Sequence, residues 1–187
     1  MKKILLILSM IIVCSLVNAQ FKLTIDGLIN AEENSKAYTV CSFDEMSKEK
    51  LFNNVLSFVT KSYVSAKDVV SKVDNEVITI NAFHPEQIKA KLLKYDMKFV
   101  MVISFRDNMI KIDAPSFECT SEFDGKPYRL VMQGSNWGLG DEVTNALFNK
   151  NGKPKLEKSI IEIETFFNVI STQICRAASG IDEDEEW

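Results

Sequence analysis

The stretch KFVMVISFRDNMIKIDA, residues 98–114, alternates apolar and polar side chains on both sides of Asp107 and Asn108. A period of two is typical of β-strands, and aspartate and asparagine tolerate the positive φ that a two-residue hairpin turn requires. The pattern therefore predicts a hairpin with strands 97–106 and 109–119. Its predicted pairs are Arg106 with Met109, Phe105 with Ile110, Ile103 with Ile112 and Met101 with Ala114.

The two faces of this hairpin differ in polarity. The predicted core face carries Phe99, Met101, Ile103, Phe105, Ile110 and Ile112. The opposite face carries Val100, Val102, Ser104, Lys111 and Asp113. Because two valines stand among polar groups on a face turned away from the core, Val100, Val102, Lys111 and Asp113 are candidate binding residues.

The segment before this hairpin predicts strands and one helix. Residues 38–43, YTVCSF, are rich in aromatic and β-branched side chains, and residues 21–26 are a candidate edge strand. From Leu51 onward, apolar residues recur at intervals of three and four, which is typical of an amphipathic helix. Ser47 is expected to be its N-cap, and the helix is expected to end near Tyr63.

A second hairpin is predicted from residues 69–73 and 77–83. Its register depends on the loop length. A three-residue loop would set Lys72 opposite Ile78 on the buried side of the sheet, whereas a four-residue loop sets Val73 opposite Ile78. We therefore expect the four-residue loop.

Other segments carry weaker patterns. Residues 84–96, HPEQIKAKLLKYD, fit either a short helix or an irregular connection. Residues 115–155 contain several glycines that mark turns, with a candidate strand at 128–132 and a candidate helical turn at 141–148. Apolar residues then recur at steps of three and four over 155–178, which predicts a helix long enough to cross a sheet.

Residues 1–19 have the features of a secretory signal peptide: Lys2 and Lys3, then an apolar run, then Ala19 before the expected cleavage site. Cleavage would make Gln20 the first residue and would change the formal charge from −4 to −6, because two lysines are lost. A net acidic exported chain is a poor partner for nucleic acid. We expect one domain over 20–180, an acidic solvated tail at 181–187 and no membrane span after cleavage.

The sequence predicts no catalytic residue, no metal ligand and no cofactor. His84 is the only histidine, and we interpret it as a turn residue before Pro85. Cys41, Cys119 and Cys175 remain after signal cleavage, so at most one disulfide can form; packing as small apolar side chains is favoured, and whether any two are joined stays open.

Two further groups of polar and aromatic residues lie in the last third of the chain. Glu157, Glu162 and Glu164 in the last predicted helix are expected to form a solvated face. Trp137 lies in a glycine-rich stretch a short distance after Arg129. Both Arg129 and Trp137 are added to the candidate binding residues.

Three stretches carry a resemblance to a known family: MSKEKLFNNVLSFV, SAKDVVSKVDNEVITI and FVMVISFRDNMIKIDAPSF, within residues 38–119. The sequence resembles a family of exported Bacteroidota domains of unknown function with a TATA-binding-protein-like fold. The resemblance implies an α+β domain in the order β-α-β-β-β-β-α, an antiparallel sheet with two helices packed on one face. It also implies export to the periplasm or cell surface of a Gram-negative bacterium, and it brings no catalytic residues.

The leading hypothesis is a secreted, non-enzymatic binding or protein-interaction module that uses the open sheet face or the loops of residues 115–155. The alternative is a carrier of a small apolar molecule in a cavity between the last helix and the sheet, with Phe166, Phe167 and Met101 as lining residues. An enzyme ranks third, because no nucleophile and base come together in the sequence. The partner is thus an unknown protein or a small apolar ligand.

Overall fold

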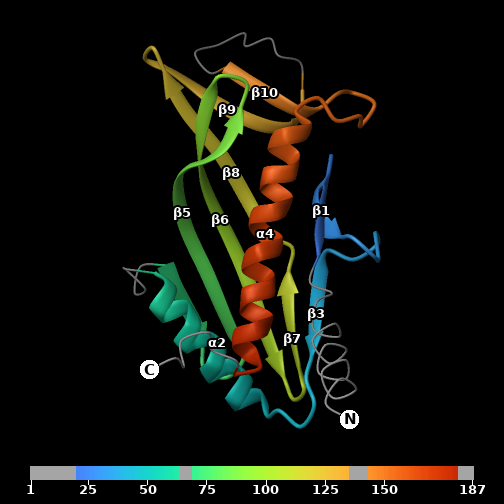
Figure 1. Ribbon diagram of the computed structural model, residues 1–187, viewed down its shortest axis with the longest axis vertical. Helices are drawn as coiled ribbons and strands as arrows, with labels where there is room; N and C mark the ends of the chain where they lie inside the picture. Colours follow the sequence, from blue (N-terminus) through green and yellow to red (C-terminus); the bar gives the residue numbers. More distant parts are fainter. Residues whose placement is uncertain (1–19, 64–68, 135–142, 181–187) are drawn as a thin grey trace, which may run out of the picture.

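A computed structural model describes residues 20–63, 69–134 and 143–180. Within those ranges the chain forms an α+β fold with an eight-stranded sheet, a separate two-stranded sheet and two helices (Figure 1). In chain order the elements are β1 Phe21–Thr24, β2 Gly27–Asn30, β3 Tyr38–Ser42, α2 Lys48–Ser62, β4 Val70–Val73, β5 Val77–Ala90, β6 Leu93–Arg106, β7 Met109–Asp113, β8 Ser116–Phe123, β9 Lys126–Gln133, β10 Val143–Phe148 and α4 Glu157–Ala178.

The large sheet is organised around β6. One edge of β6 pairs with β5, and the other pairs with β8 over its first half and with β7 near its end. The main path runs β10-β9-β8-β6-β5-β4, and β7 carries β3. All pairs are antiparallel except β9 with β10, which are parallel, so the expectation of a purely antiparallel sheet is wrong at this edge.

Both helices cover the same face of the sheet, as predicted (Figure 1). The sheet contributes a row of buried residues from β6, and each helix contributes its apolar stripe. The buried side chains of this core include Met97, Phe99, Met101, Ile103, Phe105, Leu51, Phe52, Val55, Val59, Ile163, Phe167 and Ile174. Within the described residues, neither helix is long and apolar enough to cross a membrane.

The predicted start of α2 is confirmed. The Ser47 side chain accepts a hydrogen bond from the backbone N–H of Lys50 at 3.2 Å, as an N-cap does. The turn between β6 and β7 adds a second cap, because Asp107 Oδ1 accepts from the backbone N–H of Lys48 at 2.8 Å. The residues that make the hairpin turn therefore also hold the beginning of the helix.

The register of the central hairpin is confirmed near the turn. The observed pairs are Arg106 with Met109, Phe105 with Ile110 and Ile103 with Ile112. The predicted pair of Met101 with Ala114 is wrong, because the pairing of β7 ends at Ile103 and β8 resumes one residue out of register, with Val100 opposite Ser116. The shift falls at Pro115, which has no backbone N–H to donate to a ladder.

The predicted register of the second hairpin is wrong. Val73 lies opposite Val77, and Lys72 lies opposite Ile78, so the loop has three residues with Asn75 at φ 59°. The prediction assumed that a lysine opposite Ile78 would be buried, but β4 is an edge strand that is mostly exposed. The Lys72 ammonium lies 5.9 Å from the ring centroid of Phe52, so the lysine stem covers the edge of the core while its charge stays near solvent.

Residues 84–96 form neither a helix nor an irregular connection. The strand β5 continues through them to Ala90, with a register irregularity between His84 and Ile88, and β6 begins at Leu93. Ile88 and Ala90 are both buried, which is the period-two pattern of a strand. The two-residue turn places Lys91 at φ 55° and leaves Leu92 exposed.

The candidate helical turn at 141–148 is also wrong over its described residues, because residues 143–148 form strand β10. A buried polar contact fixes this strand against β6: Asn145 Nδ2 donates to the Tyr95 hydroxyl at 2.7 Å. The amide oxygen of Asn145 accepts from Lys91 Nζ at 2.6 Å. The candidate strand at 128–132 is confirmed within β9, whereas β2 had no prediction.

The strand β1 lies beside α4, and side chains of that helix bind its free backbone edge (Figure 1). Asn168 accepts from the N–H of Phe21 at 2.6 Å and donates to its carbonyl oxygen at 3.0 Å. Glu164 accepts from the N–H of Leu23 at 2.8 Å. Side chains of α4 thus satisfy backbone groups of β1 that a neighbouring strand would otherwise bind.

The same helix binds the outer edge of β5. Ser159 Oγ donates to the carbonyl oxygen of Lys89 at 2.7 Å, and Glu162 Oε2 accepts from its N–H at 2.7 Å. The solvated face expected for the glutamates is therefore wrong for Glu162 and Glu164, which satisfy backbone groups at two sheet edges.

A disulfide joins Cys41 on β3 to Cys175 on α4, whose Cα atoms lie 6.1 Å apart. The expectation that these cysteines pack as small apolar side chains is wrong for this pair. Cys119 is free and buried, and its burial raises the pKa of the thiol to about 12. A thiol with this pKa stays protonated at neutral pH and is a poor nucleophile.

Candidate ligand-binding cleft

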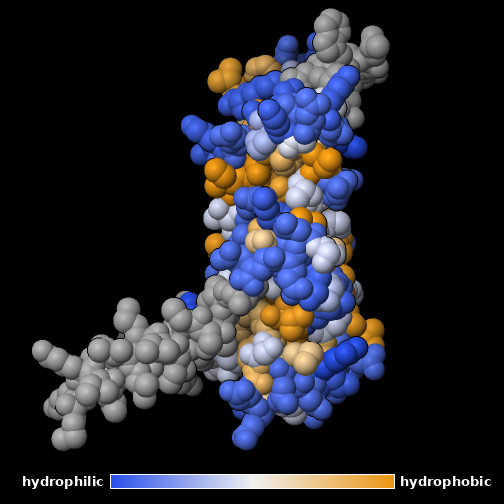
Figure 2. Space-filling model, turned by 90° about the vertical axis from the view of Figure 1, so that its right-hand side faces the viewer, coloured by the Kyte–Doolittle hydropathy of each residue, from blue (hydrophilic) through white to orange (hydrophobic). Residues whose placement is uncertain are grey.

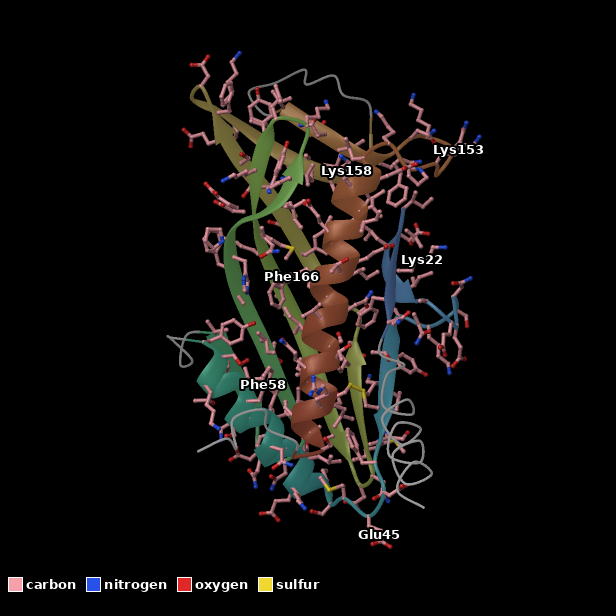
Figure 3. All side chains as sticks on the ribbon, viewed as in Figure 1. Lys22, Glu45, Phe58, Lys153, Lys158 and Phe166 are labelled. Atoms are coloured by element: carbon pink, nitrogen blue, oxygen red, sulfur yellow. A yellow bond between two sulfur atoms is a disulfide. The ribbon has the colours of Figure 1, made fainter. Side chains whose placement is uncertain are left out.

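A cleft of about 520 Å³ opens between α2, α4 and β5. Figure 3 shows two of its aromatic side chains, Phe58 on α2 and Phe166 on α4, between these elements. The lining residues are Phe58, Val59, Ser62 and Tyr63 near the end of α2; Ile80, His84 and Gln87 on β5; and Ile161, Glu162, Thr165, Phe166, Val169, Ile170, Gln173 and Ile174 on α4.

The cleft exists because the two helices diverge. They meet where the Asn54 side chain of α2 donates to the carbonyl oxygen of Ala178 at 3.0 Å, near the end of α4. From this contact α2 leans away from α4 across the sheet (Figure 1). The space between them is closed at its floor by β5 rather than by a third helix.

Apolar side chains on the α4 wall are incompletely covered. Ile161 is 59 % exposed and Val169 is 49 % exposed, and Phe166 and Ile170 on the same wall are half-buried. Single exposed apolar residues are ordinary, but these share one cleft with Phe58 from the other helix. Filling the cleft with an apolar molecule would remove this surface from water.

His84 lies within an aromatic cluster at the cleft. Its ring centroid is 5.7 Å from that of Phe99, in a stacked arrangement, and 5.1 Å from that of Phe166, edge to face. The Tyr63 ring completes the cluster at 6.2 Å. The interpretation of His84 as a turn residue is wrong, because β5 continues through it and the strand alternation directs it to the helix side, opposite Met97.

The imidazole of His84 is neutral at physiological pH. Burial lowers its pKa below the ordinary value of 6.5. Its Nε2 atom is buried and finds no hydrogen-bond partner among the described residues. Such an orphan atom carries a desolvation penalty that a hydrogen-bonding group inside the cleft could remove.

Acidification is expected to destabilise the protein through His84. Because its folded pKa lies below 6.5, the unfolded chain binds the proton more readily, so stability falls as pH falls through about 6.5 and this contribution levels off below the folded pKa. The rings around it, Tyr63, Phe99 and Phe166, carry no charge in that range. Urea unfolding at several pH values should show a smaller loss for His84→Phe than for wild type. If the free energy of unfolding falls equally with pH in both proteins, His84 is not the cause of the acid destabilisation.

The charge of the cleft is low and acidic. Among the described lining residues Glu162 is the one charged side chain, and none is lysine or arginine. One carboxylate oxygen of Glu162 already accepts the N–H of Lys89. A bound anion would therefore find no opposite charge on the cleft walls.

Five of the six predicted binding residues lie on the sheet face opposite the helices. Val100 and Val102 are there on β6, Lys111 and Asp113 on β7, and Arg129 on β9. Lys111 Nζ and Asp113 Oδ1 form an ion pair at 2.8 Å. Trp137, the sixth, lies outside the described residues.

This open face is mixed in polarity. Val100 is 37 % exposed, and Val40 and Met109 are similarly exposed on neighbouring strands. One hollow lies around Val100 and Ser116, and another lies between Tyr38 and Arg106. On the side of the molecule that carries β1, hydrophilic residues predominate and hydrophobic ones form separate patches (Figure 2).

The residues proposed for an apolar cavity are only partly confirmed. Phe166 lines the cleft, as expected. Phe167 and Met101 are fully buried in the core between the helices and the sheet and do not reach the cleft. The expected position was therefore close, but the cavity lies to the α2 side of α4 rather than directly beneath it.

The described residues contain no group of three or more histidine, cysteine, aspartate or glutamate side chains placed to hold a metal ion.

No known family model matches this sequence, and no curated protein sequence matches it. Two solved structures are similar. A TBP-like protein from Parabacteroides distasonis ATCC 8503 superposes with a TM-score of 0.55 at 21 % identity, covering 78 % of this chain and 92 % of that chain. A DUF4468 family protein from Bacteroides ovatus ATCC 8483 gives a TM-score of 0.44 at 10 % identity, covering 79 % and 86 %. The first likeness confirms the predicted fold: this chain has a TATA-binding-protein-like α+β fold.

Proposed function

We propose that this protein is an exported, non-enzymatic binding module that holds a small apolar molecule in the cleft between α2, α4 and β5. The observation that carries the proposal is the cleft itself. Its volume of about 520 Å³ falls in the usual range for small-molecule sites, ~300–1,000 Å³. The surface of its walls is mostly apolar, from aliphatic and aromatic side chains, with polar groups such as those of Gln87, Thr165 and Gln173 among them, which is the composition of such sites.

The disulfide supports the exported location. Disulfides persist in oxidising compartments and are rare in the reducing cytosol. The Cys41–Cys175 bond joins residues 134 positions apart, so it is a cross-link between the sheet and the last helix rather than a local loop. This agrees with the signal peptide predicted for residues 1–19.

The chemistry of the described side chains supports binding rather than catalysis. His84 is surrounded by aromatic rings, and among the described residues no hydroxyl or thiol is hydrogen-bonded to its imidazole for it to activate. The free thiol of Cys119 is buried and protonated. Within residues 20–63, 69–134 and 143–180, neither residue has the paired neighbour that a nucleophile or a general base needs.

The open sheet face favours a second candidate function, the docking of another protein. Val40, Val100 and Met109 expose apolar surface there, beside the charged pair of Lys111 and Asp113. This face is more polar than the cleft, and so it suits a macromolecular surface better than a small apolar molecule.

The cleft is tested by charging its wall. Val169→Glu should weaken binding of the neutral fluorescent probe N-phenyl-1-naphthylamine about tenfold or more, because the carboxylate must be desolvated when the probe enters. The melting temperature should change little, since Val169 is half exposed. Fluorescence titration and a thermal melt on the same samples measure both.

The matched control is Val102→Glu on the open face, which should leave probe binding unchanged. Absence of probe binding to wild type, or equal loss in both variants, would refute the cleft as the site. Loss of a captured protein partner in Val102→Glu, with probe binding intact, would support the second candidate function.

A further inference from the structure

We propose that the ligand of the cleft is an uncharged amphipathic molecule whose hydroxyl group binds Nε2 of His84. This inference rests on the proposed function and specifies the chemical class of the molecule bound. The apolar part would lie against the α4 wall at Phe166, Val169 and Ile170. The hydroxyl would enter the aromatic cluster around His84.

The first argument is the orphan atom. Nε2 of His84 is buried and has no partner in the described part of the chain, although the ring lines the cleft. Its neighbours are the rings of Tyr63, Phe99 and Phe166, whose ring atoms offer no conventional hydrogen-bond acceptor or donor. A buried polar atom without a partner is unusual, and ligand sites are one place where it is retained.

The second argument selects a hydroxyl. A neutral imidazole carries its proton on one nitrogen, so Nε2 is either a donor or an acceptor according to the tautomer. A hydroxyl both donates and accepts, and so it satisfies either tautomer. A carbonyl or ether oxygen satisfies only the form in which Nε2 carries the proton.

The third argument excludes ions. The described walls contain no cation to bind a carboxylate or phosphate, and Glu162 would repel either. An ammonium group could approach Glu162, but that carboxylate lies a full helical turn before Phe166 and already accepts the N–H of Lys89. A charge placed beside neutral His84 would be desolvated without an opposite charge.

Because Nε2 is buried, a ligand reaches it only when a neighbouring side chain moves, and Phe166 is the nearest ring of the cluster. Phe166 stands edge-on to the imidazole with the centroids 5.1 Å apart, and it is half-buried at the cleft wall. Its neighbour Phe167 is fully buried in the core beneath it. The aromatic cluster therefore shields His84 until a ligand displaces Phe166.

The test uses displacement of bound N-phenyl-1-naphthylamine by 1-decanol, decanoate and decylamine at neutral pH, below their aggregation concentrations. These compounds share a chain length and differ in the end group. Decanol should displace the probe at about tenfold lower concentration than either ion. In His84→Phe the advantage of decanol should fall about fivefold, the worth of one hydrogen bond, while the probe still binds. The His84→Gln variant, whose amide both donates and accepts hydrogen bonds, should keep most of the advantage of decanol over the two ions.

The matched control is Phe83→Ala, because Phe83 adjoins His84 on β5 and its side chain is exposed on the opposite face. It should change none of these values. Equal displacement by all three compounds, or an unchanged decanol advantage in His84→Phe, would overturn this inference while probe binding still supported the proposed function. Preference for decanoate or decylamine would also overturn it. Failure of the probe to bind wild type would refute the proposed function and this inference with it.

Discussion

Replacing Ile163 with aspartate is expected to unfold the domain. Ile163 lies on α4, is fully buried and belongs to the core formed with the sheet. An unpaired carboxylate in an apolar interior costs several kcal/mol, and a domain of this size has about 5–15 kcal/mol of stability in total. Circular dichroism during urea and thermal unfolding should show either no cooperative transition or a transition at much lower urea concentration and temperature than in the wild type.

The matched control for this substitution is Ile161→Asp. Ile161 is on the same helix, two positions earlier, and is 59 % exposed. A surface substitution of this kind typically changes stability by about 0.5 kcal/mol or less. Similar unfolding midpoints for the two variants would show that the buried side of α4 has been assigned incorrectly.

The buried side of α4 was predictable from sequence because helical spacing is a strong signal over many turns. Ile163, Phe167 and Ile174 recur at intervals of four and seven, and all three are buried. The central hairpin was predictable for a similar reason: its turn residues and its alternation agree. Asn108 does adopt a positive φ, of 63°.

Residues 84–96 were not predictable by the same reasoning, because two periods compete there. Ile88 and Leu92 have helical spacing, whereas Ile88 and Ala90 have strand spacing. The tertiary structure decides: Ile88 pairs with Tyr95 across the hairpin and is buried, while Leu92 is the exposed tip of the turn. A local pattern cannot show that the partner strand follows two residues later.

The sequence of α4 carries a signal of the cleft. Ile161, Phe166 and Val169 lie beside the regular stripe of α4 and widen its apolar face. A wide apolar face indicates contact with more than one neighbour. The sequence does not show that α2 diverges and leaves part of that face uncovered, because the angle between helices depends on packing with the whole sheet.

The candidate residues on the open face could be grouped from the hairpin alone, since alternation assigns Val100, Val102, Lys111 and Asp113 to one side. His84 was missed as part of a site because its neighbours come from three elements. Phe99, Tyr63 and Phe166 lie on β6, at the end of α2 and on α4. Only the folded chain brings these rings to the imidazole.

The same limit applies to the disulfide, since three cysteines allow three pairings and sequence alone cannot choose among them. Cys41 and Cys175 meet because β3 pairs with β7 at the edge of the sheet and α4 lies across it. Cys119 lies on β8, opposite Met97, and stays free. The fold therefore assigns the partner that spacing does not.

Removing the Cys41–Cys175 bond is expected to lower the free energy of unfolding by about 4–5 kcal/mol. The bond closes a loop of 134 positions, and the cost of losing a cross-link grows with the logarithm of loop length in the chain-entropy account. Cys41→Ala with Cys175→Ala should therefore show a much lower urea midpoint than wild type. A reductant should lower the wild-type midpoint in the same way and leave that of the double variant unchanged.

Cys119→Ala is the matched control, because it removes a buried thiol without removing a cross-link. It should lose only the packing contribution of one small side chain, roughly 1 kcal/mol, which separates the effect of the bond from the effect of a smaller core residue. Alkylation of the unfolded wild-type protein before and after reduction gives an independent readout, since reduction should release two further thiols from the Cys41–Cys175 bond. If reduction releases them and the unfolding midpoint of the wild type does not move, the bond contributes nothing to stability and α4 is held to β3 by packing alone.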